Sequence, residues 1–164
     1  MDTCYHEAAH GVVAIAVGAY VNYIEIGLSP YMGMLASGGC SWGSYEDLDL
    51  EDIYAIFAAG YVSDVRRGAS QSVAERQSTG DRIDLRKCLE QSKGIFLTDL
   101  GREIRFKQGI DRASELLDKP DVANAWQRLT EDLVERLKQG NARVLRNEVL
   151  DVVSPFLSDR SRFG

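Results

Sequence analysis

Two histidines near the start of the chain constrain its fold more than any other feature. His6 and His10 are the only histidines among 164 residues, and both lie in the segment HEAAH. Residues four positions apart share one face of an α-helix, where both imidazoles can reach a single metal ion. Apolar side chains recur at helical spacing between Thr3 and Ala19, around the motif. The sequence therefore predicts an N-terminal helix with His6 and His10 as metal ligands.

Glu7 lies inside the same motif but is turned to the side of the histidine face. From there its carboxylate can take a proton from a water that the metal activates, without binding the metal itself. This division of roles is the one that the HExxH pattern implies in zinc peptidases. The alternative is a solvated helix start with two surface histidines. We interpret the motif as a Zn²⁺ site with Glu7 as the catalytic carboxylate.

The other patterns predict a mainly α fold of the α+β class, with a small β-hairpin next to the motif helix. Segments 21–28 and 34–42, on either side of a turn at 29–33, predict the hairpin. The polar segment 69–80 predicts a loop. Apolar spacing predicts three further helical regions, at 49–65, at 81 to about 108, and from 122 until Pro155 stops the last one. Gly68 follows the end of the first region, and Gly94 and Gly101 weaken the second.

The length and composition of the chain limit the number of domains, the possible partners and the expected location. A chain of 164 residues suits a single domain, and we place the metal-site core at 1–108 and C-terminal helices at 121–157. The net charge of −6 disfavours nucleic acid and anionic lipid as partners. The longest apolar stretch, Gly11 to Val21, is shorter than the roughly 20 residues of a membrane span. With no signal peptide and three widely spaced cysteines, the expected location is cytoplasmic.

The residue pattern alone leaves the third metal ligand open. A catalytic zinc ion usually has three protein ligands and one water, and the chain has no third histidine. A thiolate from Cys4 would need an unfavourable spacing of two residues from His6. The chain has 25 acidic residues, so spacing does not choose among the carboxylates.

Three segments, in the same order along the chain, resemble motifs of the FtsH family of ATP-dependent zinc proteases. The run from Tyr5 to Ala14 looks like the family's HEAGHA-type helix. The segment from Ala58 to Asp64 is similar to its GGRAAEE helix, and the segment from Ser78 to Leu85 resembles its STGAxNDL stretch. The resemblance covers about residues 5–90 and implies a helical zinc-peptidase domain.

The resemblance also implies the third zinc ligand. In the family, the Asp of NDL binds the metal, and the matching position in this chain is Asp84. Asp81 occupies the place of the family's Ala and is the alternative ligand. Other departures are Ile83 for the family's Asn, Ala9 for the Gly of HEAGH and Tyr61 for the Arg of GGRAAE.

Two parts of the family's proteins have no counterpart in this chain. No segment matches GxxxxGK[ST], the loop that binds ATP phosphates, and the membrane anchor is missing. The chain is therefore expected to be either the protease part of a longer protein or a free-standing relative. A homo-oligomer or a separate ATPase partner is an expectation by analogy with the family's rings.

Together these features predict a zinc-dependent metalloendopeptidase that hydrolyses polypeptide substrates with a zinc-activated water. The hairpin edge from Met34 to Trp42 is a hypothetical site where an extended substrate adds as a strand. Two alternatives have the same metal. One is a binding or assembly module that keeps the protease fold and zinc but has lost turnover, and the other is a zinc hydrolase that acts on a non-peptide amide.

Overall fold

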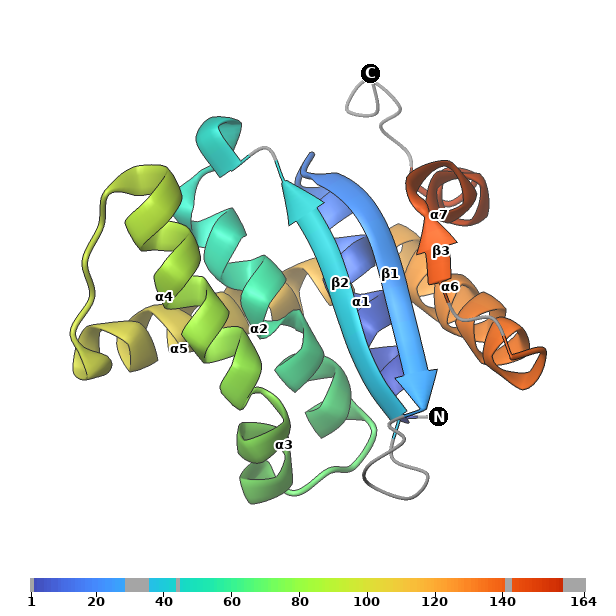
Figure 1. Ribbon diagram of the computed structural model, residues 1–164, viewed down its shortest axis with the longest axis horizontal. Helices are drawn as coiled ribbons and strands as arrows, with labels where there is room; N and C mark the ends of the chain where they lie inside the picture. Colours follow the sequence, from blue (N-terminus) through green and yellow to red (C-terminus); the bar gives the residue numbers. More distant parts are fainter. Residues whose placement is uncertain (1, 29–35, 44, 141–142, 158–164) are drawn as a thin grey trace.

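The computed structural model describes residues 2–28, 36–43, 45–140 and 143–157. Within these ranges the chain forms seven α-helices, one short 3-10 helix and one three-stranded antiparallel sheet (Figure 1). This arrangement confirms the predicted mainly α fold of the α+β class. No helix in the described ranges is both long and apolar enough to cross a membrane.

The sheet lies next to the motif helix, as predicted. It contains β1 (Tyr20–Leu28), β2 (Ala36–Gly43) and β3 (Arg143–Leu145) in the order β2-β1-β3. Helix α1 (Asp2–Ala16) packs against β1 and β2 and covers one face of them (Figure 1). Val21, Ile24 and Ile26 of β1 are therefore buried, as expected for a strand with one packed face that is interrupted by an irregularity between Val21 and Tyr23.

Helix α2 (Leu50–Arg66) is the central helix of the fold. Every residue from Ile53 to Asp64 except Tyr61 is buried, because α1 covers one side of this helix and α5 (Asp99–Leu117) covers another. A helix that is apolar around most of its circumference belongs in the protein interior. It packs directly against α1, the helix that carries the motif.

The segment 69–80, predicted to be a loop, is largely helical. Helix α3 (Gln71–Gln77) follows the end of α2, and α4 (Thr79–Lys93) begins two residues after α3 ends. The loop prediction is wrong because α3 buries a single residue, Ala74, so that no apolar period marks this helix in the sequence.

The helical region predicted from Asp81 to about Gln108 consists of two helices. Helix α4 ends at Gly94, whose φ of +64° is left-handed backbone that glycine adopts without strain. Helix α5 begins after Thr98, whose side chain caps it by accepting a hydrogen bond from the Gly101 amide. The weak point at Gly94 is thus a helix end, whereas Gly101 lies in the first turn of α5.

The last predicted helical stretch is also interrupted. Helices α6 (Pro120–Lys138) and α7 (Arg146–Val153) are separated by β3, which pairs with β1. The sequence does not reveal β3, because three residues are too few to show a strand period. The predicted hairpin is confirmed in β1 and β2, while its turn and the first residues of its second strand, 29–35, lie outside the described residues.

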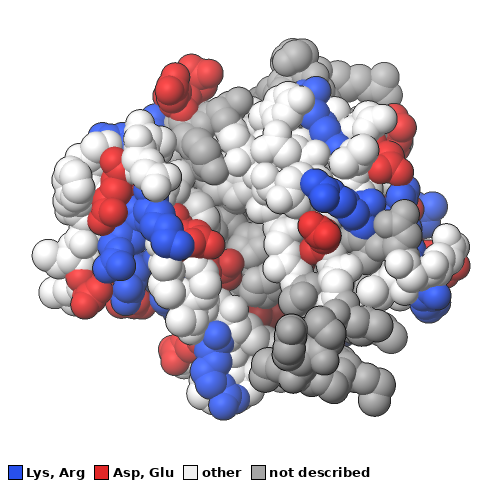
Figure 2. All heavy atoms as spheres, viewed as in Figure 1, with Lys and Arg blue, Asp and Glu red and all other residues white. Residues whose placement is uncertain are grey.

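The face of the molecule in Figure 2 has acidic and basic side chains interspersed. Some charged side chains are paired across helices, such as Arg82 with Glu103 and Arg86 with Asp99, and these pairs join α4 to α5. On the face in Figure 2 the described residues form no extended basic surface of the kind that a nucleic-acid backbone attracts.

Candidate metal centre

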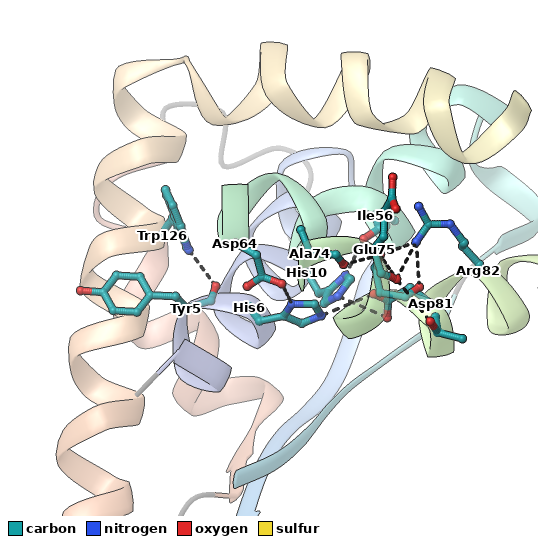
Figure 3. Close-up of polar contacts among 12 residues, drawn as sticks. Tyr5, His6, His10, Ile56, Asp64, Ala74, Glu75, Asp81, Arg82 and Trp126 are labelled. Carbon is teal, nitrogen blue, oxygen red and sulfur yellow. Dashed lines mark hydrogen bonds and ion pairs between the residues drawn. The ribbon is translucent and has the colours of Figure 1, made fainter. Parts of the chain in front are cut away.

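Helices α1 and α4 bring three potential metal ligands together (Figure 3). His6 and His10 belong to α1, and Asp81 belongs to the first turn of α4. The Nε2 atom of His6 lies 3.4 Å from Oδ2 of Asp81, and the Nε2 atom of His10 lies 3.6 Å from Oδ1 of Asp81. One ligand atom from each residue lies within 4.8 Å of the other two, so the group could hold one metal ion.

Both imidazoles are oriented by α2 through their Nδ1 atoms. The Nδ1 atom of His6 lies 2.9 Å from Oδ2 of Asp64, and the Nδ1 atom of His10 lies 2.6 Å from the backbone oxygen of Ile56. Carbonyl and carboxylate oxygens accept hydrogen bonds, so each Nδ1 donates. Such bonds are typical of metal-binding histidines, since they fix the ring and leave Nε2 for the metal. Both Nε2 atoms are therefore presented toward Asp81.

Gly60 allows α2 to pack directly on the two imidazole rings. A Cβ atom at this position would lie 2.6 Å from Nε2 of His10 and even closer to Nε2 of His6. A larger residue would have to displace both rings. The segment from Ala58 to Asp64 resembles a family motif. It thus supplies both Gly60, which allows the close approach of α2, and the Asp64 carboxylate, which orients His6.

Two buried polar atoms at this point have no hydrogen-bond partner among the described residues. They are Nε2 of His10 and Oδ2 of Asp81. Leaving a buried polar atom unpaired costs about 1–3 kcal/mol. Both atoms belong to the ligand group, so one cation bound there would satisfy both of them. The residues present therefore fit a metal ion.

The charges at the site shift the pKa values of His6 and Asp81 in opposite directions. Burial lowers the pKa of His6, but the hydrogen bond to Asp64 and the nearby negative charges of Asp81 and Glu7 outweigh it and raise the pKa to about 10. Burial raises the pKa of Asp81, but the neighbouring His10 and His6 outweigh it and lower the pKa overall. Asp81 is therefore ionised at neutral pH, whereas a metal ion must displace a proton from His6.

Glu7 lies beside the ligands, in a cavity of about 260 Å³ that His6, His10 and Asp81 also line. Glu7 is 7% exposed, and this burial is the main reason that its pKa is raised. Strand β2 approaches closely, because a Cβ atom on Gly38 would lie 2.6 Å from Oε1 of Glu7. A carboxyl group with a raised pKa can accept and return a proton near neutral pH.

Asp84, the predicted third ligand, lies apart from the histidine pair. It follows Asp81 by one turn of α4 and borders the same cavity, but its side chain is 61% exposed and accepts a hydrogen bond from Nζ of Lys87 at 2.9 Å. Asp81 lies with the two imidazoles instead, since α4 begins at Thr79 and its first turn meets the histidines. A motif match counts positions along the chain and does not specify the rotation of a helix.

Asp64 is a site residue to which the sequence motif assigned no role. It is 4% exposed, and a buried carboxylate needs a partner, which here is His6. The signal that could have identified it is spacing. Asp64 follows Gly60 by four residues, so both lie on the face of α2 that meets α1.

No family model matches this chain, and no curated protein matches it either. The resemblance to the FtsH family therefore depends on the three motif segments alone. The chemistry of the site follows from the geometry of its own residues.

Proposed function

We propose that this protein is a zinc-dependent metalloendopeptidase. The observation that supports the proposal best is the convergence of His6, His10 and Asp81, with the carboxyl group of Glu7 in the same cavity. Two imidazole nitrogens and one carboxylate oxygen form a donor set typical of catalytic zinc, with a fourth position left for water. When bound, the ion supplies the Lewis acidity that activates water and stabilises developing negative charge.

Glu7 is the proton carrier in this proposal. Its carboxylate accepts a proton from the attacking water and later gives that proton to the nitrogen of the departing amine. Burial raises the pKa of Glu7, which makes its carboxylate a better proton acceptor for the first transfer. Asp64 and the Ile56 carbonyl keep the two imidazoles in place during these steps.

The proposed substrate is an extended segment of polypeptide. Among the described residues, β2 pairs with β1 along one side, so its other side is a sheet edge. Four residues of this strand, Gly38, Gly39, Cys40 and Trp42, line the cavity that contains Glu7. A peptide that added to this edge as a further strand would bring a backbone carbonyl past Glu7.

Metal analysis combined with a proteolysis assay tests the proposal. Wild-type protein is expected to bind one zinc ion per chain and to cleave casein. Glu7→Gln should keep the zinc but lose cleavage by about 10²–10⁴-fold, because it removes the proton acceptor and leaves the ligands in place. His10→Ala should lose both the zinc and the activity.

Other outcomes would contradict the proposal in distinct ways. Zinc bound by His10→Ala as tightly as by wild type would show that the metal site is wrong. One zinc per chain without cleavage of casein or other unfolded protein would instead support a binding or assembly module with the protease fold. Hydrolysis confined to small non-peptide amides would support the second alternative.

A further inference from the structure

We infer that Gln77 is a catalytic residue whose side-chain amide donates a hydrogen bond to the carbonyl oxygen of the scissile peptide. This inference rests on the proposed peptidase function and adds a residue to it. Gln77 is the last residue of α3 and borders the cavity that contains His6 and Glu7. It also lines two adjoining cavities of about 340 and 240 Å³, the first of them with His6, Glu7 and Gly38.

Gln77 lies where a substrate on β2 would have to pass. Gly38 of β2 and Gln77 of α3 line the same two cavities, and Glu7 lines both as well. A peptide along the edge of β2 would therefore have Glu7 and Gln77 within the same space. The scissile carbonyl must enter that space to reach the metal ligands.

The corner between α3 and α4 holds Gln77 in a defined place relative to Asp81. Ser78, the residue between the two helices, is fully buried. The guanidinium group of Arg82 donates to the backbone oxygen of Ser78 at 3.3 Å and lies 4.0 Å over the ring of Phe106. The same corner thus presents Asp81 to the metal site and Gln77 to the substrate space.

The amide of Gln77 is available to a ligand. It has no hydrogen-bond partner among the described residues. Gln71, at the other end of the same helix, donates instead to the carboxylate of Glu75 at 3.0 Å. Gln77 is exposed, so its two N–H donors face solvent and can bind a ligand in place of water.

The charge balance of the cavity explains why such a donor matters. Glu7, Asp81 and Asp84 line the cavity, and its described lining includes neither lysine nor arginine. Negative charge develops on the scissile carbonyl oxygen in the transition state, close to these carboxyl groups. A neutral amide aimed at this oxygen stabilises the charge without competing with the metal ion for its ligands.

Substitution of Gln77 tests the inference in the zinc-loaded chain. Gln77→Ala should lower kcat for peptide cleavage by about 10²-fold with KM nearly unchanged, because the hydrogen bond strengthens only as charge develops. The zinc content should equal that of wild type. Gln71→Ala removes the same side chain from the same helix away from the cavity and should keep the wild-type kcat.

A binding measurement provides a readout that does not depend on turnover. A phosphinic peptide, whose charged oxygens imitate the tetrahedral transition state, should bind zinc-loaded Gln77→Ala about tenfold more weakly than wild type by calorimetry. A ketomethylene peptide of the same sequence, which imitates the ground state, should bind both proteins equally.

The failures of the two proposals are distinguishable. Wild-type protein that binds zinc but neither cleaves peptides nor binds the phosphinic peptide would overturn the peptidase proposal and, with it, the role of Gln77. An active wild type with an unchanged kcat in Gln77→Ala would overturn the role of Gln77 alone. Equal weakening of both peptide ligands would also overturn it, because Gln77 would then bind ground state and transition state alike.

Discussion

The metal cavity has two sides that are built in different ways. The histidine side consists of α1 and α2, which pack closely together. His10 and Asp64 are buried there, and the side chain of His6 is only 12% exposed. The aspartate side consists of α3 and the start of α4. Helix α3 buries a single residue, Ala74, and α4 buries only three along its 15 residues. An ion bound here would therefore take ligands from the packed interior and from a lightly packed corner.

The histidines and the groups that orient them thus belong to packed helices of the interior, whereas Asp81 belongs to a corner that polar contacts join to α5. Gly60 and the Ile56 carbonyl belong to a helix that also forms the centre of the fold. On the other side, Arg82 joins the corner to Glu103 at 3.1 Å and to the ring of Phe106. A change on the histidine side should therefore alter folding and metal binding together. A change on the aspartate side should alter metal binding with little effect on folding.

The largest effect is expected from Gly60→Ala, on the histidine side. The added methyl group would overlap both imidazole rings, so the rings must move and zinc binding should fall below detection. Overpacking should also lower the free energy of unfolding by about 1–3 kcal/mol. Zinc analysis and urea unfolding measure the two effects. Gly80→Ala, where an added Cβ meets nothing within 4 Å, is the matched control and should keep its zinc.

The next largest effect is expected from Asp81→Ala, on the aspartate side. Loss of one of the three protein ligands should weaken zinc binding by roughly 100-fold, or about 3 kcal/mol. The free energy of unfolding without metal should change little. Asp84→Ala removes an exposed carboxylate one turn away and should bind zinc like wild type. The reverse ranking of these two variants in a competition assay with a chelating dye would restore Asp84 as the ligand.

The pH dependence of zinc affinity is expected to come from the histidine side and not from the aspartate side. Because the pKa of His6 is raised to about 10, zinc must displace its proton at neutral pH, and affinity should fall as the pH falls. The expected change is about tenfold per pH unit between about pH 8 and pH 6. Asp81 adds nothing to this slope, since its lowered pKa keeps it ionised throughout. Calorimetry in buffers of different ionisation enthalpy would count the proton, and a count of zero would contradict the assignment.

The smallest effect is expected from Arg82→Met, which removes contacts that hold the α3–α4 corner and leaves all three potential metal ligands unchanged. Loss of its hydrogen bonds to the corner and its contact with Phe106 should weaken zinc binding less than tenfold and lower the free energy of unfolding by about 1 kcal/mol. Arg86→Met, on the same helix with an exposed partner in Asp99, is the control and should change neither quantity. A loss as large as that of Asp81→Ala would show that the corner itself determines the site.

Local patterns in the sequence predicted the elements that bury many apolar residues. The helix that carries HEAAH and helix α2 bury apolar side chains along most of their length, and β1 packs one face against α1. Helix α3 and strand β3 escaped prediction for the opposite reason. Each buries one residue, Ala74 and Val144, and a single buried residue has no period.

Local spacing is enough to place His6, Glu7 and His10 on one helix, since the helical repeat involves only a few neighbouring residues. The folded chain was needed to show that Asp81, rather than Asp84, meets the histidines and that Asp64 orients one of them. These contacts depend on the rotation and approach of α2 and α4, which are set by packing across the whole core. That packing is a sum over many distant contacts, which no local spacing records.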